Sequence, residues 1–213
     1  MAWTLTTIRS LVRTLTGEKS TSQWSNDDVD TAINEFYQDT FPHEIALPEL
    51  WDWATWSVNT AEDGDYDIAE TTLKLRAPWT LDDGDGDAVA ELSWTYNRPA
   101  FFETYPEDDS RDEGIPGAVL IYGPKIYIRP KADAAYTIKA AAYEKPALLT
   151  VSVNPVSDRW GPAIAYGTAI QRLNDRGDYE ETTGLAPLYQ YHLNNVNRKT
   201  LARLSGVRSV PRF

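Results

Sequence analysis

The acidic run at residues 82–87, Asp-Asp-Gly-Asp-Gly-Asp, is the part of the sequence most suggestive of metal chemistry. A calcium loop of the EF-hand type starting at Asp83 would need glycine at its sixth position and glutamate at its twelfth. Ala88 and Trp94 stand at those positions. We therefore predict a solvated acidic turn here, with no metal site and no cofactor.

Catalytic chemistry finds little support elsewhere in the chain. His43 and His192 are the only histidines and there is no cysteine, so a histidine-based triad, a multi-histidine zinc site and disulfides are not expected. No P-loop or dinucleotide-binding glycine motif is present. Among 32 acidic residues some neighbouring pair is expected by chance, so such a pair identifies no active site. We predict that the protein is not an enzyme.

Tryptophan is the next residue type whose spacing could matter. Five of the eight tryptophans lie in a region rich in strand-forming residues: Trp51, Trp53, Trp56, Trp79 and Trp94. Gathered on one sheet face, they could stack on a sugar. Aromatic side chains more often fill sheet cores and interfaces, and we favour that interpretation.

Charge is distributed unevenly along the chain. The formal net charge is −12, yet the C-terminal segment 198–213 contains no acid. Its basic residues are Arg198, Lys199, Arg203, Arg208 and Arg212. This segment is too short to bury its apolar side chains against itself, so we predict that it docks elsewhere, although chain termini are also commonly frayed. The acidic remainder is unsuited to tight nucleic-acid binding, because that affinity comes mainly from neutralising phosphates.

The N-terminal region is predicted to form two helices. Apolar residues recur at helical spacing up to Gly17, a residue type common just after helix ends. Ser25 begins the second helix, with Asp28 three residues later as in a capping box. We expect this helix to end at Phe41-Pro42, because proline disfavours helical geometry in the residue before it.

The middle of the chain is predicted to contain strands and turns. Strands are expected at 51–58, 73–76, 92–96, 119–122, 126–129 and 136–143. The last three are expected to form a meander, which begins with a hairpin around a Gly-Pro-Lys turn. Residues 103–116, dense in acid and proline, are expected to form a loop.

The C-terminal region is predicted to return to helix. Ser-Asp at 157–158 is expected to cap a helix that ends near Gly177, and a longer helix follows from Asp178. We expect Gly184 and Pro187 to break or kink the first turns of this longer helix.

The three regions together predict an α+β fold. Neither terminal pair of helices can cover its apolar faces alone, and the two pairs together could. We therefore predict a four-helix unit from 1–49 and 150–205, an inserted antiparallel β domain over 50–149, and an extended C-terminal docking arm at 206–213.

Three segments, taken in order, resemble a known family. The first is TLTTIRSLVRTLTG, followed by SNDDVDTAINEFYQDTFPHEI. The second is GAVLIYGPKIYIRPKADAAYTIKAAAYEKPALL, and the third is AIAYGTAIQRLNDRGDYEETTGLAPLYQYHLNNVNRKTLARLSGVRSVPRF. In their order of helices, strands, paired helices and arm, they are similar to the head-to-tail connector (adaptor or neck) proteins of tailed bacteriophages.

The resemblance implies a structural virion protein that forms a ring, usually of twelve copies, beneath the portal. The ring would form part of the channel through which viral DNA passes during ejection, without sequence-specific contact. The arm would grip the portal, with Gly206 as its hinge. The implied portal-binding residues are Arg203, Val207, Arg208, Ser209, Val210, Pro211, Arg212 and Phe213. Further implied partners are neighbouring copies of the chain and a downstream neck or tail protein.

Two alternative functions stay open. The protein could be another neck or tail-completion ring protein, or a Trp-rich carbohydrate-binding module. No apolar stretch is long enough to span a bilayer, and the N-terminus lacks the pattern of a secretory signal. We therefore expect a virion protein made in the host cytoplasm, with no membrane partner.

Overall fold

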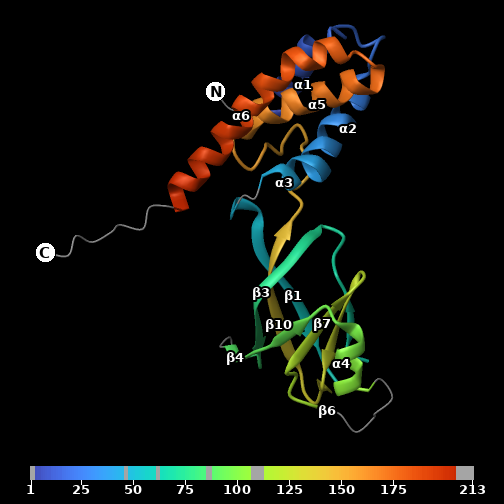
Figure 1. Cartoon of the computed structure of the whole chain (residues 1–213), viewed down its shortest axis with the longest axis vertical. Coiled ribbons are helices and arrows are strands. Elements are labelled where there is room, and N and C mark those ends of the chain that lie inside the picture. Colours follow the sequence, from blue (N-terminus) through green and yellow to red (C-terminus); the bar gives the residue numbers. More distant parts are fainter. Residues whose placement is uncertain (1–2, 46–47, 61–62, 85–87, 107–112, 205–213) are drawn as a thin grey trace, which may run out of the picture. The chain divides into compact units, whose positions relative to one another are not determined.

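The structure, a computed structural model, describes residues 3–45, 48–60, 63–84, 88–106 and 113–204, with the backbone alone at 48, 88–89 and 199–204. The chain divides into two compact units (Figure 1). The helical unit comprises Met1–Leu50 and Lys145–Phe213, and the β unit comprises Trp51–Glu144. Helices dominate one unit and mainly antiparallel strands the other, which confirms the predicted α+β class.

The helical unit is organised around α5. Its elements are α1 (Leu5–Thr16), α2 (Asn26–Glu35), the π-helix η1 (Phe36–Thr40), α3 (Phe41–Glu44), the 3₁₀ turn η2 (Pro48–Leu50), α5 (Trp160–Arg176) and α6 (Tyr179–Leu204). α5 contacts α1, α2, η1 and α6. Gly167 allows one of these approaches, since a Cβ there would lie 2.0 Å from Cζ of Phe36. A helix in contact with so many neighbours needs small side chains on its packed faces.

A buried ion pair ties the α1–α2 connection to α5. Glu18, only 8% exposed, accepts hydrogen bonds of 3.1 and 2.9 Å from Nε and Nη2 of Arg172. The same guanidinium lies over the ring of Trp24, 4.6 Å from its centroid. A bidentate pair of this kind fixes the position of both partners.

The predicted N-terminal helix signals are confirmed. α1 ends at Gly17, whose φ of 70° is the left-handed conformation that glycine adopts without strain. α2 begins after Ser25, whose hydroxyl oxygen accepts the Asp28 backbone N–H at 3.1 Å. These signals are local, because each needs only the few residues around the helix end.

The predicted helix end at Phe41-Pro42 is wrong. The chain continues from α2 through η1 into α3, and the backbone N–H of Phe41 donates to the carbonyl of Phe36, five residues earlier. This wider turn places Pro42 in the first turn of α3, where a backbone N–H has no helical partner to lose.

The predicted Ser-Asp cap of α5 and the predicted break within α6 are also wrong. Arg159, without a side-chain cap, precedes α5, because the Asp158 carboxylate instead accepts the Trp3 N–H at 3.2 Å. α6 runs unbroken from Tyr179 to Leu204. Gly184 and Pro187 are both exposed, so water can solvate the carbonyl that proline leaves without a partner.

The compact helical unit resumes at Lys145, ahead of the predicted boundary at residue 150. The amide of Asn34 on α2 donates to the carbonyl of Leu149 at 3.1 Å and accepts its N–H at 2.7 Å. Gln38 donates to the carbonyl of Pro146 at 2.9 Å. These bonds hold the non-helical segment before α5 on the helical unit.

The β unit contains two four-stranded sheets. Its elements are β1 (Trp51–Val58), β2 (Asp65–Asp67), β3 (Thr72–Asp82), β4 (Ala88–Glu91), β5 (Ser93–Thr95), α4 (Arg98–Thr104), β6 (Glu113–Gly114), β7 (Ala118–Tyr122), β8 (Lys125–Arg129), β9 (Lys131–Ala132) and β10 (Tyr136–Glu144). The sheet orders are β1-β10-β3-β4 and β2-β8-β7-β5, with β6 and β9 as a separate pair. The β5–β7 and β6–β9 pairs are parallel.

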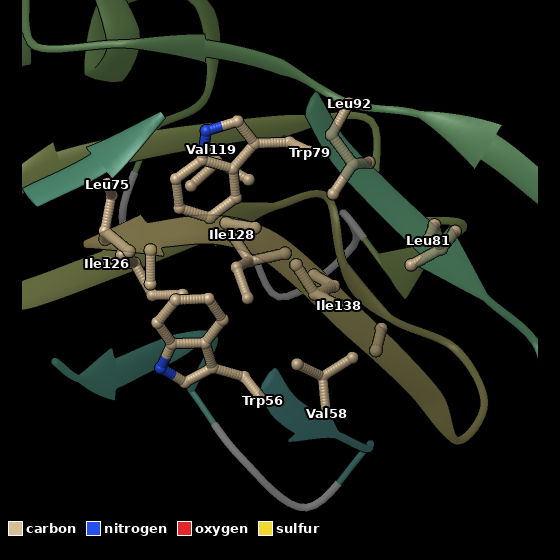
Figure 2. Close-up of a cluster of buried hydrophobic side chains, with 13 residues drawn as sticks. Trp56, Val58, Leu75, Trp79, Leu81, Leu92, Val119, Ile126, Ile128 and Ile138 are labelled. Carbon is tan, nitrogen blue, oxygen red and sulfur yellow. The ribbon is translucent and has the colours of Figure 1, made fainter. Parts of the chain in front are cut away.

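The core of the β unit is shared by both large sheets. Trp56 and Trp79 stack with ring centroids 5.7 Å apart and planes 13° apart (Figure 2). Around them lie buried side chains from one sheet, Val58, Leu75, Leu81 and Ile138, and from the other, Val119, Ile126 and Ile128. The two sheets therefore face each other across one apolar layer, as in a β-sandwich.

The predicted hairpin is confirmed, but the predicted meander is wrong. β7 and β8 pair antiparallel across a two-residue turn, Gly123-Pro124. β10 does not pair with β8 but lies between β1 and β3 in the other sheet. The place beside β8 is taken by β2, where Asp65 lies opposite Tyr127.

The prediction for residues 92–116 missed a change of sheet and a helix. β4 and β5, separated only by Leu92, belong to different sheets. The short helix α4 follows, capped by Asn97, whose side-chain oxygen accepts the Ala100 N–H at 3.3 Å. The sequence Asn-Arg-Pro at 97–99 is typical of a helix start and could have predicted α4.

Two glycine substitutions should have opposite effects on stability. Gly167→Ala should lower the free energy of unfolding by about 1–3 kcal/mol, because the buried Phe36 ring has no space to move away. Gly184→Ala, in open space on α6, should raise it by about 0.5–1 kcal/mol. Urea unfolding measures both values, and stabilisation by Gly167→Ala would contradict the close packing of α5.

Candidate functional site

The predicted docking residues fall at and beyond the end of α6. Arg203 lies on this helix, although its side chain is outside the described residues. The others are also outside the described residues: Val207, Arg208, Ser209, Val210, Pro211, Arg212 and Phe213. The helix that leads to these residues, α6, is within the described part of the chain.

α6 is longer than the helix it packs against. α5 has 17 residues and α6 has 26, and only Gly177 and Asp178 separate them. At 1.5 Å per residue, α6 extends roughly 13 Å past the start of α5. Figure 1 shows the C-terminal end of α6 running beyond the other helices of its unit. We call residues 197–204 the overhang of α6.

Apolar contacts anchor α6 up to the overhang. Leu193 is 7% exposed and Val196 is 1% exposed. One turn earlier, the Tyr189 ring meets Phe36 edge-on, with centroids 6.2 Å apart, and its hydroxyl donates to the Glu44 carboxylate. Burial, and then this carboxylate, raise the pKa of Tyr189 above its ordinary value. The helix therefore has a firm base immediately before the overhang.

The part of α6 before the overhang contains no lysine or arginine, and its one histidine, His192, is packed against an aromatic ring. His192 stacks on Tyr166, with centroids 5.0 Å apart. Burial lowers the pKa of His192, so its ring is neutral near pH 7. The cations begin at Arg198, which is exposed, and continue at Lys199 and Arg203. Positive charge at a helix C-terminus interacts favourably with the helix dipole.

The negative charge of the protein is concentrated in the β unit. Its sequence holds 19 acidic and eight basic residues, a net charge of −11, whereas the helical unit holds 13 and 12, a net charge of −1. Within the predicted acidic turn, Asp82 is 6% exposed and accepts from Lys139 Nζ at 2.8 Å and from the Gly84 N–H at 2.9 Å. Part of that run is therefore structural rather than solvated, and residues 85–87 lie outside the described residues.

The structure does not gather the five tryptophans on one face. Trp56 and Trp79 are buried in the core, and Trp51 is half-buried. Trp53 is 51% exposed on β1 and Trp94 is 40% exposed on β5, which belong to different sheets. Two of the five thus have the predicted core role, and the exposed two form no common platform.

Other kinds of site have little support in the described residues. In the part of the chain that the structure describes, no three His, Asp or Glu side chains group closely enough to hold a metal ion. Within the same residues, no helix has the length and hydropathy needed to cross a membrane. His43 is exposed on α3.

Removing the Tyr189 hydroxyl should loosen the base of the overhang. We expect Tyr189→Phe to cost about 1 kcal/mol and to speed hydrogen exchange of the amides that follow it. Because the pKa of Tyr189 is raised on folding, the parent protein should also lose stability as the pH rises above about 10, and the variant should lose less. Tyr191→Phe, at a side chain that is 61% exposed, is the matched control. Equal effects of the two variants would contradict this role.

Comparison with known proteins agrees with the sequence resemblance. The family described as SU10 adaptor protein matches residues 3–210, nearly the whole chain. A search of curated proteins finds no significant match. The chain belongs to the SU10 adaptor protein family, consistent with a head-to-tail adaptor of a phage, which is a structural component of the virion.

Proposed function

We propose that this SU10 adaptor family member forms a ring beneath the portal and connects the capsid vertex to the tail. The observation that carries this proposal is the overhang of α6. It extends past α5 from a buried base and continues into a basic, apolar segment that contains no acid. A segment that cannot bury its own apolar side chains gains most by docking on a partner.

The docking contact is assigned by residue type. Val210 and Phe213 are the apolar anchors, and Arg208 and Arg212 form ion pairs with the portal. Arg and aromatic side chains commonly dominate interface energetics. The contact made by one arm is weak, but its repetition around a ring, which we take to have twelve copies, multiplies its effect.

The acidic β unit supports a second part of the proposal. Its net charge of −11 repels the phosphate backbone, so DNA can pass a channel formed by the ring without being held. A downstream neck or tail protein is the remaining partner.

Loss of the arm should abolish binding to the portal. We expect the full chain to co-sediment with portal rings of the same phage and a chain ending at Gly206 to stay in the supernatant. As a matched pair, Arg212→Glu should weaken binding about tenfold or more, because it places a like charge against the acceptor. Lys19→Glu, at an exposed residue far from the arm in sequence, should have no effect.

The truncated chain must keep the melting temperature of the full chain for this comparison to hold. Equal binding by both chains would contradict the role of the arm and move the contact to the helices or the β unit. Binding of neither chain to portal, but of both to another tail ring, would support a neck or tail-completion protein instead.

The full chain should fail to bind duplex DNA at physiological salt. With a duplex of about 30 base pairs and about 0.1 M salt, we expect no saturable change in fluorescence anisotropy up to about 10 µM protein. The chain ending at Gly206, which lacks two arginines, should behave in the same way. A sub-micromolar dissociation constant would refute passive passage of DNA.

A further inference from the structure

The first half of β3 has one unpaired edge. β10 pairs with β3 from Thr72 to Asp82, whereas β4 pairs with it only from Thr80 to Asp82. Among the described residues, no second strand lies beside 72–76. A register shift in the β3–β10 pairing follows at Ala77-Pro78 and ends this stretch. Such an edge presents a row of unpaired backbone donors and acceptors that can bind another strand.

An apolar groove of about 390 Å³ runs along this edge. Four consecutive residues of β3, 72–75, line it. Successive side chains of a strand point to opposite faces of the sheet. A groove lined by four consecutive residues therefore lies beside the edge of the strand and not over one face of the sheet. The other lining side chains are mainly apolar and come from the opposite sheet and the loop before β3, including Ile68, Tyr96, Ile121 and Pro124.

Exposed aromatic rings extend this groove. Tyr96 is 57% exposed and meets Trp94, which is 40% exposed, edge-on with centroids 5.3 Å apart. Tyr122 does not belong to this surface, because it alternates with the groove-lining Ile121 and its ring is covered by the Arg98 guanidinium, 4.9 Å from the centroid. Two half-exposed aromatic side chains in contact, one of them lining the groove, are typical of a surface that a partner covers.

The charge of the β unit indicates what kind of segment fits. The groove itself has one acid and one base at its rim, Glu70 and Lys74, so it is locally balanced. The surrounding unit carries a net charge of −11. Its field therefore favours a cationic occupant, and this preference should weaken as salt is added.

We propose that the β3 edge binds an extended, basic segment of another virion protein as an added strand. The Thr72 N–H already donates to the Ala69 carbonyl at 2.8 Å, so backbone hydrogen bonds to 73–76 provide affinity. Alternate apolar side chains of the segment enter the groove. Basic side chains at the intervening positions point out of the groove, toward the acidic surroundings. The inference rests on the proposed function only in taking the partner to be a virion protein.

The test uses the full chain and a synthetic peptide of seven residues that alternates valine and lysine. Calorimetry should show it binding at least about tenfold more tightly than the same peptide with glutamate in place of lysine, with the difference shrinking at high salt. N-methylation of alternate amides along one edge should also weaken binding about tenfold, because it removes backbone donors and keeps the side chains. Hydrogen exchange at 73–76 should slow when the peptide binds.

Matched variants locate the site. Tyr96→Ala should weaken peptide binding about tenfold, and Trp53→Ala, at an exposed tryptophan on the other sheet, should not change it. Both side chains are more than half exposed, so neither variant should unfold the protein. Equal loss in both variants, or full binding of the N-methylated peptide, would overturn the proposal.

The other possible occupant is a second copy of this chain. Concentration-dependent self-association that Tyr96→Ala abolishes would identify it and overturn the assignment to another protein. Portal binding by Tyr96→Ala should equal that of the parent chain. Failure of the peptide experiment therefore leaves the docking of the arm on the portal untouched.

Discussion

The pairing of β1 with β10 is the constraint on which the rest of the structure depends. β1 is the first strand of the β unit and β10 the last, and they lie side by side and antiparallel, with Trp51 opposite Tyr143 and their rings 5.4 Å apart. The chain therefore leaves and re-enters the helical unit through neighbouring strands, about 5 Å apart. Because of this, α1–α3 and α5–α6 can form one helical unit although the whole β unit separates them in sequence.

The two units also differ in charge. The helical unit is almost neutral and ends in a basic overhang, whereas the β unit carries nearly all of the net negative charge. The backbone of α6 continues past the helix against which it packs. The same helix is fixed at its base by Tyr189 and Val196, so the overhang starts from a defined place on the unit. Under the proposed function, portal docking and repulsion of DNA are therefore assigned to different units.

Local signals were predictable from the sequence and long-range pairings were not. The stops at Gly17 and Gly177, the cap at Ser25 and the β7–β8 hairpin each depend on a few neighbouring residues. β10 follows β8 in sequence, but β2 pairs with β8 and β10 pairs with β3. Which strand pairs with β8 is decided by contacts across the whole β unit, not by neighbouring residues. The Asp158 cap failed for the same reason, because its carboxylate binds Trp3 at the other end of the chain. The candidate site was predicted from the basic and apolar residues of the C-terminal segment and from the family resemblance. The overhang that leads to it follows from where α5 begins and ends.

The central claim is that the arm beyond α6 joins this protein to the portal. The most direct measurement is an electron cryomicroscopy reconstruction of the assembled neck at a resolution that shows side chains. The account predicts density for residues 206–213 against the portal, with the overhang of α6 leading into it. Density that places the β unit against the portal and the arm against the tail would contradict it.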